Sequence, residues 1–199
     1  MTRALRYTLD TNCVIDAVQG HGQAEAVHGL VELARQGQVT LWLTRSFDSD
    51  QLRANDENRQ ANHRWLAECG VIGRVPGGIR LDHPVLGRLD GQAVLVDDET
   101  AAKEEILERL LLPERLRVGN LDGSDEVLMA QFLRRIDDVD HLSAHRMHGH
   151  DVFVTRDKPI LRHRGHLLTE VGIVVETPDE ALERRRGTLV RERPRSQPG

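Results

Sequence analysis

The chain has 199 residues, of which 39% are hydrophobic and 30% charged, and this composition excludes a disordered chain. No apolar run approaches the roughly 20 residues that cross a membrane, so we expect no membrane partner. The 32 acidic residues outnumber the 27 basic residues and give a net charge of −5, which argues against a protein that coats nucleic acid through bulk positive charge.

The first residues and the cysteine content indicate where the protein resides. The start, MTRALRYTLDTN, leads directly into a strand-like segment, with no apolar signal-peptide stretch before it. The two cysteines, Cys13 and Cys69, are too few for a disulfide framework. We therefore expect a cytoplasmic protein.

Hydrophobic periodicity predicts strands that alternate with helices along the chain. In the first third, we expect strands at 6–9 and 39–43, and helices at 24–35 and at 48–69, the last one interrupted around 55–58. In the rest of the chain, we expect a turn at Pro76-Gly77-Gly78, strands at 93–96, 151–155 and 171–176, and helices at 99–112, 125–136 and 140–148.

This alternation predicts an α/β protein, with helices in two layers around a largely parallel sheet. Residues 1–182 are expected to form the one domain. Residues 183–199 are rich in Arg and end in Pro, Ser and Gly, so we interpret them as a basic, flexible tail. We assign no role to residues 70–120.

Three aspartates share one relation to the predicted elements. Asp10 follows the strand Tyr7-Thr8-Leu9, Asp157 follows the strand 151–155, and Asp140 begins a predicted helix. The carboxyl ends of parallel strands share one edge of a sheet, where ligands gather. Carboxylates gathered there repel one another, and a divalent cation relieves that repulsion. Taken singly, Asp10 and Asp157 are interpreted as ordinary loop acids and Asp140 as a helix N-cap, and only their combination favours a metal site.

Polar neighbours accompany these acids. Asn12 and Thr155 are short polar side chains that can orient Asp10 and Asp157. Arg156 is a candidate for contact with a substrate phosphate, and a surface salt bridge is its other interpretation.

Histidines form a cluster close to the last acids. His141 and His145 have the i, i+4 spacing of some zinc sites, but no H-E-x-x-H pattern is present and the cysteines are far away. We therefore interpret these histidines as solvated helix positions or as residues that face a phosphate near the site.

The segments LDTNCVIDA and DVDHLSAHRMHGHDVFVTRDKPIL resemble the two signature regions of the PIN-domain family, whose members include VapC-like ribonucleases. The resemblance implies a three-layer PIN-like fold and a site in which Asp10, Asp140 and Asp157 hold Mg²⁺ or Mn²⁺. It also implies an RNA substrate and, because many relatives are toxins, a protein inhibitor or antitoxin as partner. A homodimer is an arrangement that the sequence leaves open.

The second acid departs from the family pattern. PIN domains place a Glu in the helix after the second strand, and here that register falls on Asp50, with Asp48 nearby. An Asp is one methylene shorter than a Glu. Two functions follow: a metal-dependent endoribonuclease that uses Asp10, Asp50, Asp140 and Asp157, or a non-catalytic PIN-like module that binds RNA or a protein partner.

Overall fold

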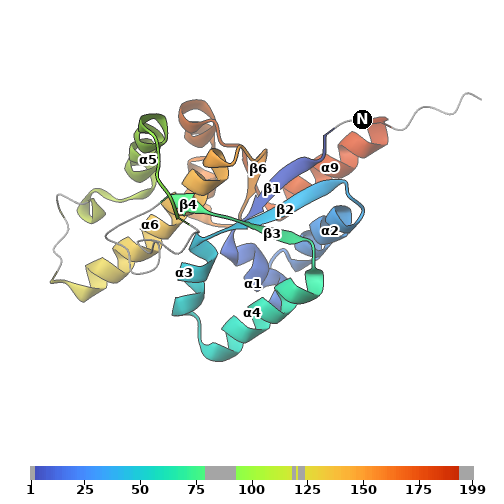
Figure 1. Cartoon of the computed structure of the whole chain (residues 1–199), viewed down its shortest axis with the longest axis horizontal. Helices are drawn as coiled ribbons and strands as arrows, with labels where there is room; N and C mark the ends of the chain where they lie inside the picture. Colours follow the sequence, from blue (N-terminus) through green and yellow to red (C-terminus); the bar gives the residue numbers. More distant parts are fainter. Residues whose placement is uncertain (1–2, 79–92, 118–119, 121–123, 193–199) are drawn as a thin grey trace, which may run out of the picture.

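A computed structural model describes residues 3–78, 93–117, 120 and 124–192 of the chain. Its centre is a five-stranded, all-parallel sheet in the order β3-β2-β1-β6-β7 (Figure 1). The strands are β1 (Leu5–Leu9), β2 (Val39–Thr44), β3 (Ile72–Val75), β6 (Val152–Val154) and β7 (Val175–Glu176). A two-stranded parallel sheet joins β4 (Gly77–Gly78) to β5 (Ala93–Val94).

Helices cover both faces of the large sheet, so the predicted three-layer α/β/α sandwich is confirmed (Figure 1). One face packs against α1 (Thr11–Gln19), α2 (Ala24–Arg35), α4 (Asp56–Cys69) and α9 (Pro178–Glu192). The other packs against α5 (Asp98–Leu111), α6 (Glu126–Met147) and the π-helical turn η3 (Leu167–Val171). The shorter elements are α3 (Ser46–Arg53), η1 (Glu114–Leu116), α7 (Lys158–Arg162) and α8 (Arg164–His166).

Strand alternation explains why two separate cores form. Tyr7 and Leu9 point into the core beneath α1 and α2, whereas Phe153 points into the core beneath α5 and α6. Successive strand residues face opposite sides of a sheet, and parallel strands covered on both faces are apolar on both. In the part of the chain that the structure describes, no helix combines the length and apolar character needed to cross a bilayer.

Helix α6 corrects the prediction of two helices at 125–136 and 140–148. It is one continuous helix, so Asp140 lies well inside it and the expectation that Asp140 begins a helix was wrong. The acids at 137, 138 and 140 do not interrupt this helix. Ile136, Val139 and Leu142 recur every third residue and are fully buried, so they keep one apolar face in contact with the core.

Other boundaries differ from the sequence-based expectation. The interruption near residue 55 is confirmed, because Asn55 caps α4 by accepting a hydrogen bond from the Asn58 backbone N–H. The expected turn at Gly77-Gly78 is instead strand β4. The strand expected at 171–176 is limited to Val175–Glu176, since η3 still occupies Val171.

The domain boundary expected at residue 182 falls inside a helix. Because α9 runs from Pro178 to Glu192, residues 183–192 of the predicted flexible tail are helical. The remaining residues of that predicted tail, 193–199, lie outside the described part of the chain.

Candidate metal centre

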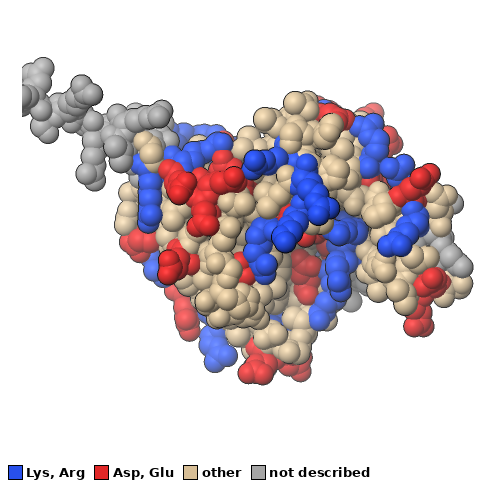
Figure 2. Space-filling model, turned by 180° about the vertical axis from the view of Figure 1, so that it is seen from behind, with Lys and Arg blue, Asp and Glu red and all other residues tan. Residues whose placement is uncertain are grey.

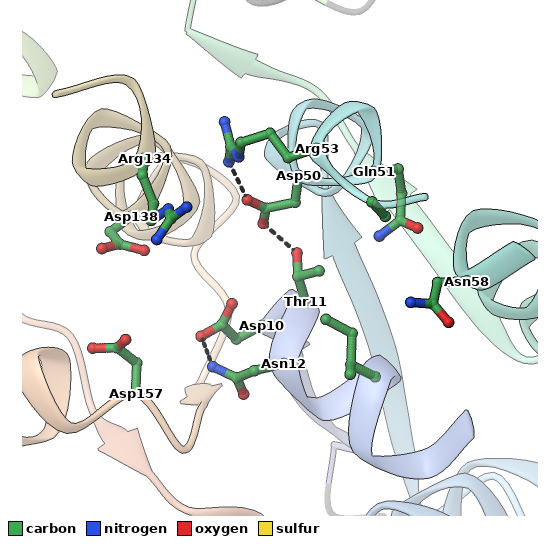
Figure 3. Close-up of a pocket in the computed structure, with 12 residues that line it drawn as sticks. Asp10, Thr11, Asn12, Asp50, Gln51, Arg53, Asn58, Arg134, Asp138 and Asp157 are labelled. Carbon is green, nitrogen blue, oxygen red and sulfur yellow. Dashed lines mark hydrogen bonds and ion pairs between the residues drawn. The ribbon is translucent and has the colours of Figure 1, made fainter. Parts of the chain in front are cut away.

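Two of the predicted acids follow neighbouring strands and lie at the same edge of the sheet. Asp10 directly follows β1, and its backbone N–H donates to the Val154 carbonyl at 2.9 Å. Asp157 follows β6 and caps α7, accepting a hydrogen bond from the Ile160 backbone N–H at 3.0 Å. Because β1 and β6 pair directly, both carboxylates line one open cavity of about 400 Å³ (Figure 3).

The choice between Asp48 and Asp50 is decided by their places on α3. Asp50 lines the cavity that Asp10 and Asp157 share (Figure 3). Asp48 is 42% exposed in its side chain and pairs with Arg74 at 3.0 Å, away from the cavity-lining residues. Of these two aspartates, only Asp50 lines the cavity.

The acid that α6 contributes to the cavity is Asp138, and Asp140 is not among the lining residues (Figure 3). Each residue of an α-helix turns by roughly 100°, so side chains two positions apart point to nearly opposite sides. Asp138 therefore faces the cavity, whereas Asp140 is buried on another side of α6. His141, three residues after Asp138, returns to the side that faces the site.

A chain of hydrogen bonds holds Asp50 in place. Its Oδ2 accepts from the Thr11 hydroxyl at 2.6 Å and lies 3.2 Å from His141 Nε2. On the other side of the ring, His141 Nδ1 lies 2.5 Å from the Thr44 hydroxyl. The second Asp50 oxygen, Oδ1, binds Arg53. The carboxylate is thus fixed by three different elements, α1, α3 and α6.

Asn12 and Thr155 hold Asp10, in the positions that the sequence suggested for them. The Asn12 amide donates to Asp10 Oδ2 at 2.5 Å and to the Thr155 hydroxyl at 3.1 Å. Thr155 in turn donates to the same Asp10 oxygen. The Thr155 hydroxyl also accepts the Asp157 backbone N–H at 2.9 Å, so one side chain connects the two acids.

Crowding of acids changes the affinity of the site for protons. Burial, together with the neighbouring Asp50 and Asp157 charges, raises the pKa of Asp10 against the opposing effects of His141 and Thr155. Burial, Asp10 and Asp157 raise the pKa of Asp138 to about 7, with Arg135 opposing. Negative charge is therefore in excess here when no cation is bound.

His141 partly offsets this excess. Burial by itself lowers the pKa of His141, but the hydrogen bond to Asp50 and the charges of Asp10, Asp50 and Asp137 outweigh it and raise the value to about 9. For Asp50 the effects are reversed: burial raises its pKa, but His141, Thr11 and Arg53 outweigh burial and lower the pKa. His141 is 1% exposed and His145 likewise, which corrects their interpretation as solvated helix positions.

Three side chains are close enough to share an ion. One ligand atom each from Asp10, Asp50 and His141 lies within 4.8 Å of the others. Carboxylate oxygens suit Mg²⁺ and Mn²⁺, and the His141 nitrogen can join them only after it gives up its proton, because only a neutral imidazole binds a metal. With Asp138 and Asp157 on the same cavity, the chemistry of the donors fits a divalent cation.

Arg156 does not line the cavity. Its Nε lies 2.7 Å from Oδ2 of Asp16, a fully buried carboxylate in α1. The loop after α1 bends closely around this carboxylate: Gly22 has a φ of 62°, and a Cβ added there would meet Asp16 Oδ2 at 2.4 Å. Arg156 thus connects the turn between Thr155 and Asp157 to α1.

Sequence reasoning missed Asp138 and underestimated His141. The signal for both was present, since they are three residues apart and share a helix face if 126–147 is treated as one helix. Thr11 was also not anticipated at the site, because only the fold brings α1 and α3 together. Arg53 was a candidate for a phosphate contact or a salt bridge, and in the structure it pairs with Asp50.

Comparison with known proteins gives similarity to solved structures but no sequence match. No family model matches the sequence, and no curated protein matches it either. A chain in the crystal structure of VapBC2 from Rickettsia felis, bound to a DNA fragment from their promoter, is similar at 14% sequence identity and a TM-score of 0.40. That similarity covers 87% of this chain and 98% of the other.

Proposed function

We propose that this protein is a PIN-like, metal-dependent endoribonuclease that hydrolyses RNA phosphodiester bonds with Mg²⁺ or Mn²⁺. The observation that carries the proposal is the convergence of four carboxylates on one open cavity, from β1, α3, α6 and β6. These four are Asp10, Asp50, Asp138 and Asp157. We assign to Asp138 the role that the sequence analysis gave to Asp140, because Asp138 lines the cavity.

The residues at the site divide into those that would hold the cation and those that fix the carboxylates in place. Asp10, Asp50, Asp138 and Asp157 would hold the cation, which when bound supplies Lewis acidity toward a phosphodiester and activates water. Asn12 and Thr155 fix the Asp10 carboxylate through their hydrogen bonds. Thr11 and His141 fix Asp50 in the same way. The open cavity leaves room for a phosphate.

The substrate and the partners rest on the sequence resemblance. The segments LDTN and VTRD are similar to those of PIN-domain ribonucleases, which favours RNA as the substrate. The same resemblance favours a protein inhibitor or antitoxin as the partner, and the low cysteine content favours a cytoplasmic protein.

One observation favours the rival function, a non-catalytic module that binds RNA or a protein. Asp50 already has both oxygens occupied by protein groups, with Thr11 and His141 at Oδ2 and Arg53 at Oδ1. Because its oxygens already have hydrogen-bond partners, this carboxylate costs the fold less free energy when no cation is present. The rival would therefore keep the fold and the cavity without using a metal.

An RNA cleavage assay separates the two functions. We expect Asp10→Asn to lower cleavage of single-stranded RNA by at least about 100-fold in Mg²⁺ or Mn²⁺. Mutating a residue that only hydrogen-bonds to a metal ligand already costs about 10–100-fold in activity, and Asp10 is a proposed ligand itself. Asp48→Asn is the matched control, since this exposed aspartate on α3 lies outside the cavity, and it should cleave normally. Melting curves confirm that both variants fold. If the wild-type protein cleaves no RNA, and the wild-type protein and the Asp10→Asn variant bind RNA with equal affinity, the protein is the binding module.

A further inference from the structure

A second cavity, of about 300 Å³, adjoins the candidate metal centre and is rich in arginine. We call it the arginine pocket, and its lining residues are Pro113, Arg115, Leu116, Gln131, Arg134 and Arg135. Arg134 also lines the acidic cavity, where Figure 3 shows it beside Asp138 on α6. The two cavities are therefore neighbours that share one side chain.

The arginine pocket is formed by η1 against α6. Leu112, which precedes η1, and Leu116, the last residue of η1, are each 2% exposed and belong to the core that contains Phe132 of α6. This anchoring fixes the position of Arg115, whose guanidinium donates to the Gln131 side-chain oxygen at 3.1 Å. The segment 70–120, which had no assigned role, thus contributes one wall of the pocket.

Most of the positive charge in the arginine pocket is not neutralised. Arg135 pairs with Asp138 at 3.0 Å. Arg115 bonds only to a neutral amide, and Arg134 forms no hydrogen bond or ion pair, among the residues that the structure describes. Glu126 shares a separate hollow with Arg134. Two exposed guanidinium groups therefore remain available for an anion.

Basic side chains are also grouped on the face of the molecule that Figure 2 shows. Figure 2 shows Lys and Arg in a band over the middle of one face, beside acidic side chains. In a chain with a net charge of −5, attraction of a polyanion depends on such local groups. A nucleic-acid strand that enters an acidic cavity needs positive charge next to it.

We propose that the arginine pocket binds a backbone phosphate of the nucleic-acid strand, next to the phosphate that enters the acidic cavity. This rests on the proposed function and extends it to a subsite. Guanidinium groups bind phosphate through paired hydrogen bonds, and phosphate contacts position a strand without reading its bases. Arg134, between the two cavities, guides the strand from Arg115 toward Asp138.

Salt-dependent binding tests this subsite without any cleavage. Wild-type protein, Arg115→Gln and Arg134→Gln would be titrated into a short fluorescent single-stranded RNA in EDTA, at several salt concentrations. Each variant should bind roughly five- to tenfold more weakly at low salt, and the slope of log K against log salt should fall by about 0.7 for each lost phosphate contact. Arg35→Gln is the matched control, an exposed arginine that ends α2 at the opposite edge of the sheet, and it should behave as wild type.

The result also distinguishes failure of the subsite from failure of the proposed function. If wild-type protein binds and cleaves RNA while both pocket variants keep its affinity and salt slope, the subsite is wrong and the nuclease stands. If wild-type protein binds no RNA even at low salt, the subsite is wrong, and the separate cleavage assay decides on the nuclease. A reduced slope in both pocket variants, with the Arg35→Gln slope unchanged, supports the subsite.

Discussion

Asp138 and Asp140 stand two residues apart on α6, yet only Asp138 lines the acidic cavity. Sequence alone favoured Asp140, so the two positions offer a direct comparison. We expect Asp138→Asn to weaken Mn²⁺ binding by at least about tenfold, because it removes an anionic oxygen from the ligand set. Asp140→Asn should leave Mn²⁺ affinity within about twofold of wild type. Calorimetric titration of both variants measures this, and the opposite order of effects would contradict the assignment.

At the scale of elements, Asp16 and Arg156 join α1 to the turn between β6 and α7. Asp16 is fully buried, and its Oδ2 forms an ion pair with Arg156 Nε at 2.7 Å. The Arg156 side chain is 43% exposed. If this pair holds the turn, Arg156→Gln should lower the free energy of unfolding by about 1–2 kcal/mol, because a buried carboxylate loses a charged partner. If Arg156 serves only to contact a substrate phosphate, the urea midpoint should not move. Arg162→Gln, on nearby α7, is the control.

Strand β1 contacts α6 and the segment after it through one hydroxyl and two histidines. The Thr8 hydroxyl lies 2.8 Å from His145 Nδ1 and 2.7 Å from His150 Nδ1. One hydroxyl can donate to one ring and accept from the other, so two neutral imidazoles satisfy it. Burial, with the charges of His150 and Arg6, lowers the pKa of His145 to about 3. Burial, with the charges of Arg6 and His148, lowers the pKa of His150 to about 4.

These lowered pKa values predict a loss of stability in acid. Below the unfolded histidine pKa of about 6.5 the unfolded chain takes up protons that the folded chain refuses, so stability falls as pH drops from about 6.5 toward 4. At pH 5 His145 alone should cost about 2 kcal/mol. His145→Gln keeps a partner for Thr8 but cannot be protonated, so its unfolding free energy should fall less between pH 7 and pH 5. Equal losses in both proteins, measured by urea unfolding, would refute the argument.

Local patterns predicted the acids that follow strands. Asp10, Asp50 and Asp157 each come shortly after an apolar strand, and a parallel sheet brings such positions to one edge. Asp138 could not be found in this way, since its place depends on the continuity of α6 through a run of acids. Strand β3 was missed because Gly73 weakens its strand pattern. The fold needs that glycine, since a Cβ there would meet the Trp42 ring at 2.5 Å.

At the scale of the whole molecule, the net charge of −5 is distributed unevenly. Four carboxylates line one cavity, and arginines line the adjoining one, with Arg134 in both. A divalent cation at the first cavity and a phosphate at the second would each offset part of the charge that lines that cavity. The sheet order places β1 at the centre, so Asp10 lies between the acids that α3 and β6 provide.

The most direct test of the central claim is a crystal structure of the wild-type protein soaked in Mn²⁺, with anomalous data. We predict an anomalous peak among Asp10, Asp50, Asp138 and Asp157, within about 2.0–2.3 Å of at least two carboxylate oxygens. Crystals of Asp10→Asn, soaked in the same way, should show a much weaker peak. A wild-type map with no peak in this cavity, or with Mn²⁺ bound only elsewhere, would contradict the assignment of a metal centre.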